Sequence, residues 1–277
     1  MKKILAALLL LAGTAFTPQL EARNLWAFLS YSTFNSPEGP YIETYLSVAA
    51  NSVTFVPVAN GKFKATVNIL MTFKQGNDIK AFRKYELASP EIADTLATDF
   101  QFIDQQRFAI PNGTYDFEIQ LADANRTVPP MPYNQQVTID FPADKPDFSG
   151  VQLIKSYTRS ETPTALSKSG YDLVPYVFTF YPETEGKMVF YTELYHMDKV
   201  MPADQKFLLT YFFESFESNV RLNAYVKSRK ETVRSVNPIL SEIDIADLPS
   251  GNYNLVLEAR NQKNEVVASK KLFFQRM

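Results

Sequence analysis

Apolar and polar residues alternate along most of the chain, with the two-residue period of β-strands that bury one face. Valine, isoleucine, threonine, tyrosine and phenylalanine, which favour strands, fill these segments, and turn-forming residues separate them. In the first half, the pattern predicts strands at Leu25–Phe34, Tyr41–Val48, Ser52–Val56, Lys62–Phe73, Ile79–Ala88, Phe100–Ile110, Tyr115–Ala122 and Gln135–Phe141. In the second half, it predicts strands at Val151–Tyr157, Pro175–Phe180, Lys187–Tyr195, Lys206–Phe216, Arg221–Val226, Glu231–Val236, Ser241–Ile245, Tyr253–Ala259 and Glu265–Phe274.

Prolines cluster between the two sets of strands, from Pro129 to Pro146. Because proline cannot donate a hydrogen bond to a ladder, such a cluster interrupts a sheet. We therefore place a boundary at residues 143–149, between a first domain over 23–145 and a second over 146–277. One helical turn is expected at Pro90–Thr98. The pattern predicts an all-β chain of two tandem immunoglobulin-like β-sandwiches after a signal peptide.

A weak internal repeat supports two copies of one sandwich. Its anchors keep their order in both halves, while the distances between them drift as loops of different length would make them drift. The paired segments are Tyr41–Tyr45 with Phe190–Tyr195, Lys62-Phe63 with Lys206-Phe207, and Pro111–Tyr115 with Pro249–Tyr253. In the last pair, a glycine allows the turn that enters a strand, and a tyrosine follows two residues later. This element resembles the tyrosine corner of immunoglobulin-like folds, so Tyr115 and Tyr253 should be buried in equivalent positions.

The first 22 residues have the pattern of a secretory signal peptide. Lys2 and Lys3 precede an apolar run at Ile4–Phe16, and Leu20–Ala22 ends in a small residue that suits signal peptidase. The apolar run is too short for a stable membrane-spanning helix. We therefore predict export to the periplasm or the cell surface, with a mature chain that begins near Arg23.

Composition narrows the classes of function. The formal net charge is −2, so the chain lacks the excess of basic residues that is typical of proteins that bind nucleic acid or an anionic membrane. The chain has no second long apolar run, so we predict no transmembrane segment after processing. The chain has no cysteine, so disulfides, thiolate nucleophiles and zinc–thiolate sites are excluded. An exported chain without cysteine is typical of a bacterial envelope.

Candidate catalytic and metal-binding residues are few. His196 is the single histidine, and no nucleophile elbow, P-loop or dinucleotide fingerprint accompanies it. We expect His196 to be a strand-end residue, and we predict no catalytic residue, cofactor or metal. Three acids, Asp140, Asp144 and Asp147, flank the domain boundary, where calcium sites can form, but their spacing matches no EF-type loop.

Two further groups are interpreted as ordinary strand faces. Alternation places Glu242 and Asp244 on a solvent face, with Ile243 and Ile245 inward. Along the long strand at Lys206–Phe216, four residues should form a core face, namely Phe207, Leu209, Tyr211 and Phe213. Phe212 and Phe216 would then point outward, and we predict them as a partner surface.

Several segments resemble the β-rich region of GWxTD-domain proteins from Bacteroidetes. They are Ala27–Phe34 followed by Pro40–Leu46, and Lys168–Tyr176 running into Val189–Tyr195. The Gly-Trp-x-Thr-Asp motif itself is absent, and the only tryptophan is Trp26. The resemblance implies exported, envelope-associated, non-catalytic β modules. In such bacteria, Asp94-Thr95-Leu96 also resembles an O-glycosylation signal, with Thr95 as the acceptor.

These observations predict an exported, non-catalytic binding or scaffold module of the bacterial cell envelope, with a protein or glycan partner. One alternative is a glycan hydrolase, which would need two converging carboxylates flanked by aromatic side chains. The other is a periplasmic chaperone built from two immunoglobulin-like domains. It would need a long exposed edge strand and a basic anchor at the domain junction, near which Lys145 and Lys155 lie.

Overall fold

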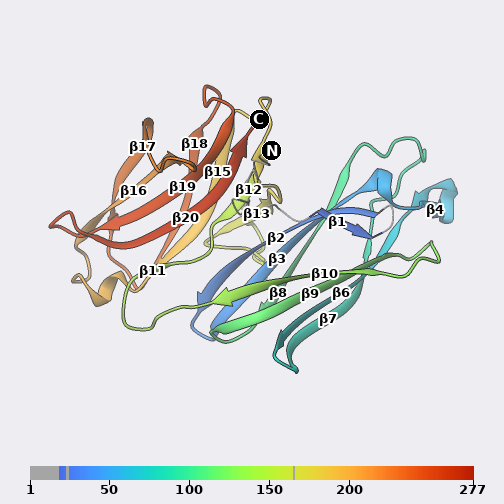
Figure 1. Cartoon of the computed structure of the whole chain (residues 1–277), viewed down its shortest axis with the longest axis horizontal. Coiled ribbons are helices and arrows are strands. Elements are labelled where there is room, and N and C mark those ends of the chain that lie inside the picture. Colours follow the sequence, from blue (N-terminus) through green and yellow to red (C-terminus); the bar gives the residue numbers. More distant parts are fainter. Residues whose placement is uncertain (1–18, 23–24, 165) are drawn as a thin grey trace, which may run out of the picture.

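The structure, a computed structural model, describes residues 19–22, 25–164 and 166–277 and folds them into β-sheets (Figure 1). Within these ranges the chain forms no α-helix, so the predicted all-β class is confirmed. Residues 1–18 of the predicted leader lie outside the described residues. Its last four residues, Gln19–Ala22, form β1.

The first sandwich pairs two four-stranded sheets, in the orders β1-β2-β3-β8 and β10-β9-β6-β7. Their strands are β1 (Gln19–Ala22), β2 (Leu25–Ser36), β3 (Gly39–Ala49), β6 (Thr66–Gln75), β7 (Asp78–Ala88), β8 (Gln101–Ala109), β9 (Gly113–Asp123) and β10 (Met131–Ile139). The small ribbon of β4 (Val56–Pro57) and β5 (Phe63–Lys64) lies beside them.

The second sandwich pairs two five-stranded sheets. One has the order β11-β15-β12-β13, with β18 also paired to β15, and the other has the order β14-β20-β19-β16-β17. Their strands are β11 (Asp147–Phe148), β12 (Gln152–Arg159), β13 (Tyr171–Pro175), β14 (Phe180–Tyr181), β15 (Lys187–Tyr195), β16 (Lys206–Ser215), β17 (Arg221–Thr232), β18 (Val236–Asp244), β19 (Gly251–Arg260) and β20 (Val266–Arg276).

The two sandwiches repeat one strand plan. The neighbours β2-β3-β8 correspond in chain order and pairing to β12-β15-β18, and β10-β9-β6-β7 correspond to β20-β19-β16-β17. This correspondence confirms the internal repeat predicted from the sequence. Figure 1 shows the sandwiches next to each other, with β2 and β3 of the first close to β12 and β13 of the second.

One of the three predicted anchor pairs is wrong. Phe73 pairs with Phe117 in the first sandwich, and Phe213 pairs with Leu255 at the equivalent place in the second. This register makes Lys206, the start of β16, equivalent to Thr66 rather than to Lys62. The shared Lys-Phe letters therefore misled the alignment, because a short β-ribbon precedes β6 in the first sandwich only.

Other predicted elements also differ from the structure; the predicted strand Pro175–Phe180, for example, is a strand only at its two ends, where β13 ends and β14 begins. Pro90–Thr98 forms no helix, and its backbone instead makes an isolated bridge and a turn. The turn expected between Val226 and Glu231 is absent, because β17 continues through this polar run as an edge strand, where exposed charges are tolerated. Most of Ser52–Val56 lies outside any strand, between a 3-10 turn and β4.

The tyrosine corners are confirmed in both sandwiches. Tyr115 and Tyr253 are buried, and each hydroxyl donates a hydrogen bond of 2.9 Å to a carbonyl four residues earlier, that of Pro111 or Pro249. A side chain at Gly113 would place its Cβ only 3.0 Å from the Tyr115 hydroxyl. The glycine of this motif therefore leaves room for the ring as well as making the turn.

The two cores lie between the paired sheets, as the alternation predicts. The predicted inward residues of β16 and β18 are buried in the second core, whereas Glu242 and Asp244 are exposed. The closing strand β20 extends further than predicted, and it ends on Arg276, which is buried. The Arg276 guanidinium donates to backbone carbonyls of two separate segments, including that of Pro182 at 2.6 Å and that of Leu248 at 3.3 Å. These bonds fix the end of the second sandwich.

Candidate functional site between the two sandwiches

The equivalent strands β3 and β15 carry the same triplet on the face turned away from their own core. Strand alternation gives this face the pattern Tyr-x-Glu-x-Tyr in both strands. The residues are Tyr41, Glu43 and Tyr45 in β3, and Tyr191, Glu193 and Tyr195 in β15. All of them are buried or half-buried because both faces are turned to the junction between the sandwiches. The predicted repeat thus marks this junction.

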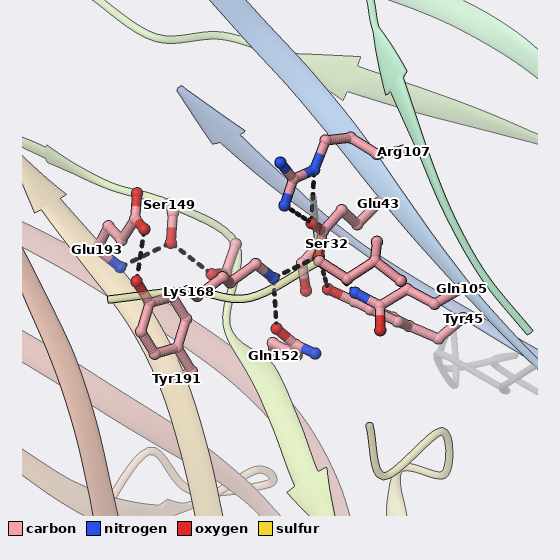
Figure 2. Close-up of polar contacts among 12 residues, drawn as sticks. Ser32, Glu43, Tyr45, Gln105, Arg107, Ser149, Gln152, Lys168, Tyr191 and Glu193 are labelled. Atoms are coloured by element: carbon pink, nitrogen blue, oxygen red, sulfur yellow. Dashed lines mark hydrogen bonds and ion pairs between the residues drawn. The ribbon is translucent and has the colours of Figure 1, made fainter. Parts of the chain in front are cut away.

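Glu43 is a fully buried carboxylate with donors on both oxygens (Figure 2). Its Oε1 accepts hydrogen bonds from the Nη2 and Nε atoms of Arg107, at 2.6 and 2.9 Å. Its Oε2 accepts from the Tyr45 hydroxyl at 2.8 Å and from the Gln105 amide at 3.2 Å. The Lys168 ammonium pairs with the same Oε2 from the second sandwich. A buried charge is tolerated when it is paired in this way.

Lys168 reaches this carboxylate from a tight turn just before β13. Its ammonium also donates to Gln152 Oε1 at 2.6 Å and lies 4.0 Å from the centre of the Phe34 ring. The rings of Tyr191 and Tyr45 lie somewhat further from it, at 5.6 and 5.9 Å. Burial lowers the pKa of Lys168, and the charge of Glu43 opposes that shift.

Glu193 occupies the equivalent position in β15 but has different partners. It accepts hydrogen bonds from the Tyr191 hydroxyl at 2.5 Å and the Tyr195 hydroxyl at 2.6 Å. In the described part of the chain, no lysine or arginine nitrogen lies within ion-pair distance of it. The Tyr195 hydroxyl also accepts from the backbone N–H of Asn35 at 2.9 Å, which ties β15 to β2.

The backbones of the two sandwiches touch at Gly150. Its N–H donates to the Thr33 carbonyl at 2.7 Å, and the nearby Ser32 Oγ donates to the Val151 carbonyl at 3.2 Å. A Cβ at position 150 would lie 2.6 Å from the Thr33 nitrogen. Only glycine therefore permits this approach.

Apolar side chains complete the junction. Phe34, Ile154, Leu173 and Tyr191 form a small buried cluster drawn from both sandwiches. Tyr195 is 2% exposed and joins the first core, where its ring meets Phe141 edge-on at 5.5 Å. A junction that shares side chains in this way restricts the motion of one sandwich relative to the other.

A cavity of about 380 Å³ opens beside this network, with walls from both sandwiches. Among its lining residues are aromatic rings, hydroxyls and an amide, as in Tyr31, Tyr176, Phe178, Thr138 and Gln135. Lys270 and Lys271 of β20 also line it, whereas none of the residues that line it is an aspartate or a glutamate. Its volume falls within the range of small-molecule sites.

The predicted partner surface on β16 is wrong for Phe212. This residue is only 5% exposed, because the Arg221 guanidinium lies 4.3 Å above its ring. Phe216 is half-buried and packs edge-on against Phe273, with ring centres 4.9 Å apart. Alternation correctly predicted that both rings point away from the core, but it could not show that residues of neighbouring strands cover them.

The remaining sequence candidates are not members of the junction network, although the His196 ring lies 6.4 Å from the ring of Tyr195. His196 adopts a left-handed backbone conformation at the start of a 3-10 turn, and its N–H donates to the Ser235 carbonyl. Thr95 is exposed in a turn, as a glycan acceptor requires. Lys145 is exposed, and Lys155 pairs with Glu185.

In the described residues, no group of three or more histidines or acids is placed to hold a metal ion. This covers the three acids near the boundary, of which Asp147 is half-buried. None of the helical elements in the described ranges is long and apolar enough to cross a membrane.

Sequence reasoning missed the residues that complete the junction, namely Arg107, Gly150, Gln152 and Lys168. The signal that could have located it was the repeated Tyr-x-Glu-x-Tyr pattern. An acid flanked by two tyrosines on the outward face of a central strand is unusual for a solvated surface. From the sequence alone, the pattern indicates only a duplication. Its partners come from other strands and turns, so their spacing along the chain gave no cue.

The fold and the junction define a protein of two β-sandwiches with a cavity between them. No protein-family model matches the chain, and no curated protein matches it. Among solved structures, it is similar to a glycosyl hydrolase family 2 member from Bacteroides cellulosilyticus, at 11% identity and a TM-score of 0.28, covering 84% of this chain and 26% of that chain. It is also similar to a Bacteroides uniformis beta-glucuronidase, at 8% identity and a TM-score of 0.29, covering 83% and 26%. The chain thus spans about a quarter of each protein, and likeness at this level assigns no function.

Proposed function

We propose that this chain is an exported, non-catalytic binding module of the bacterial cell envelope, and that its ligand is a glycan residue held in the cavity between the sandwiches. The observation that carries the proposal is the cavity itself, about 380 Å³ in volume and walled by both sandwiches. Because the junction is shared, the walls keep a fixed spacing, and little ordering is needed when a ligand enters.

The chemistry of the walls favours a sugar over a purely apolar ligand. Tyr31 and Phe178 bring aromatic surface to the cavity for contact with the C–H groups of a pyranose, while Gln135 and Thr138 bring hydrogen-bonding groups. Both polar residues lie on β10, at the edge of its sheet, where a chain of linked sugars could continue into solvent.

The placement of the acids favours binding over hydrolysis. Glycoside hydrolysis needs two carboxyl groups that face the scissile bond, and no acid lines the cavity. The two acids of the junction are already engaged, Glu43 by two cations and Glu193 by two hydroxyls. The same pairing argues against the chaperone alternative, because Lys168 and Arg107 neutralise Glu43 instead of facing an open cleft.

Titration of the purified chain with neutral and acidic oligosaccharides, followed by calorimetry, tests the proposal. We expect saturable binding to at least one glycan class, and binding about tenfold weaker or worse in Tyr31→Ala and Gln135→Ala. Phe82→Ala is the matched control, because Phe82 is 66% exposed on β7 and lies outside the cavity. No binding across the panel, or equal binding by all variants, would contradict the proposal.

Export is tested separately. Deletion of residues 2–22 should retain the chain in the cytoplasm, whereas the intact chain should be recovered in the envelope or the medium with a processed N-terminus near Arg23. Equal distribution of the two forms would overturn this part of the proposal and leave the glycan site untouched.

A further inference from the structure

Three buried polar side chains are grouped at the junction. An amine, a primary amide and a carboxylate meet at Lys168, Gln152 and Glu43, which are 5%, 1% and 0% exposed (Figure 2). The Lys168 Nζ contacts both Gln152 Oε1, at 2.6 Å, and Glu43 Oε2. These are the groups needed to convert an amide and an amine into a new amide.

The Gln152 amide is held in one orientation and is incompletely bonded. Its oxygen accepts from Lys168, which places the amine beside the carbonyl group that it would attack. Its Nε2 is buried and has no hydrogen-bond partner in the described part of the chain. A buried NH₂ group without acceptors costs stability, and a native structure that retains one calls for an explanation. Loss of this nitrogen as ammonia would remove the cost.

We propose that Lys168 and Gln152 condense into an intramolecular isopeptide bond, with Glu43 as the proton carrier. The Glu43 carboxylate takes a proton from the Lys168 ammonium, and the neutral Nζ attacks Cδ of Gln152. A new Nζ–Cδ bond forms, Glu43 delivers a proton to Nε2, and the Cδ–Nε2 bond breaks. Ammonia leaves with the second amine proton as ammonium, and Glu43 returns to the carboxylate. No oxidant or other reagent is needed.

The surroundings support each step. Burial, at 5% exposure, lowers the pKa of the Lys168 amine, so the neutral amine is easier to reach than in water, although the charge of Glu43 opposes this shift. Arg107 binds Oε1 of Glu43 and leaves Oε2 turned to Lys168, so the proton-carrying oxygen is fixed in place. The cavity that Gln152 also lines gives ammonia a way out.

The product would strengthen the junction. The bond would link β12 to the turn before β13 and hold the intervening segment, residues 153–167, as a closed loop. The remaining N–H of the new amide can still donate to Glu43, so the contact between the sandwiches survives the reaction. The inference is independent of the glycan proposal, which rests on other residues of the cavity.

Mass spectrometry of the purified chain tests the inference. After the N-terminus has been determined, the intact mass should be lower than calculated by one ammonia molecule, and digestion should yield one cross-linked pair of peptides joined through Lys168 and Gln152. Trypsin should not cleave after Lys168. Fragmentation that places the lost ammonia elsewhere would overturn the inference, as would recovery of both residues in separate, unmodified peptides.

Variants assign the roles. Lys168→Arg, Gln152→Ala and Glu43→Gln should each restore the full calculated mass, whereas Lys155→Ala, on the exposed side of β12, should keep the loss. Circular dichroism checks that each variant folds. A variant that does not fold leaves the decision to the wild-type peptide map, which needs no mutation. A Glu43→Gln chain that folds and still forms the bond at the wild-type rate would overturn the role of Glu43.

Discussion

The two sandwiches are alike inside and different where they meet. Their strand plans match, and the tyrosine hydroxyl of each corner makes a hydrogen bond of 2.9 Å to a backbone carbonyl. At the junction, the equivalent acids Glu43 and Glu193 are stabilised by different kinds of partner. Glu43 is paired with two cations, one from each sandwich, whereas Glu193 accepts hydrogen bonds from two tyrosines of its own strand.

This difference shows what constrains each part of a duplicated chain. A corner or a core has to satisfy only its own sandwich, so both copies can keep the same residues. A junction between tandem copies is heterologous, since each copy presents a different surface to the other. A second buried ion pair in the same closed space would add its own desolvation cost. Lys168 and Gly150 therefore have no counterparts of the same role in the first sandwich.

The largest effect should come from removing the acids one at a time. Glu43→Ala leaves Lys168 and Arg107 without their carboxylate and should lower the free energy of unfolding by about 3–5 kcal/mol. Glu193→Ala leaves two hydroxyls without an acceptor and should cost about 1–3 kcal/mol. Urea denaturation of both variants measures the difference. Equal losses would mean that the two acids are energetically equivalent despite their partners.

The tyrosine corners test whether equivalent interior positions contribute equally to the stability of the two sandwiches. Tyr115→Ala and Tyr253→Ala each remove a buried ring and should each cost about 3–5 kcal/mol. Because the corners match in burial and hydrogen bonding, we expect the two losses to agree within about 1 kcal/mol. Thermal or urea unfolding measures them. A loss confined to one sandwich would show that the corners share geometry without sharing importance.

A smaller effect is expected at the backbone contact. Gly150→Ala places a Cβ against the Thr33 nitrogen, and the resulting shift should cost about 1–3 kcal/mol. The damage should fall on the junction rather than on either core. A protease site inserted after Ala143, within the predicted boundary, reports on this. After cleavage, the halves should stay associated in the parent chain and separate in the variant, as size-exclusion chromatography would show.

Gly186→Ala is the control for that experiment. A Cβ at Gly186 meets nothing within 4 Å, and Gly186 has no positive φ, so the substitution introduces neither a clash nor backbone strain. We expect its halves to remain associated. Separation of the parent halves after cleavage would show that the junction cannot hold them, and it would favour two independent domains with the predicted boundary at 145 and 146.

The sequence predicted what depends on local pattern. Alternation located most strands and the inward faces of β16 and β18, and Pro-x-Gly-x-Tyr located both corners. It could not predict contacts between distant segments. Lys168 reaches Glu43 across 125 residues, and the covering of Phe212 by Arg221 depends on the pairing of β16 with β17. Such contacts arise from tertiary packing, to which local periodicity is blind.

The smallest effect concerns the hydroxyls around Glu193 at high pH. Burial, and after it the Glu193 charge, raises the pKa of Tyr195 well above the usual value of about 10. In the unfolded chain, this hydroxyl loses its proton near its usual pKa, while in the folded chain it keeps it. The stability that it contributes is therefore complete below about pH 10 and is lost as the pH rises toward the folded pKa.

Tyr195→Phe removes this titration together with two hydrogen bonds. At pH 7 the variant should be less stable by about 1 kcal/mol. Between about pH 10 and 11, the variant should lose about 1 kcal/mol less stability than the parent chain, because the unfolded tyrosine is about half ionised at pH 10 and mostly ionised at pH 11. Tyr157→Phe is the matched control, because Tyr157 is 42% exposed and should change neither value. Parallel curves of stability against pH for all three chains would show that the folded state does not hold the Tyr195 proton. The inference that Glu193 is stabilised by the two tyrosine hydroxyls would then be wrong.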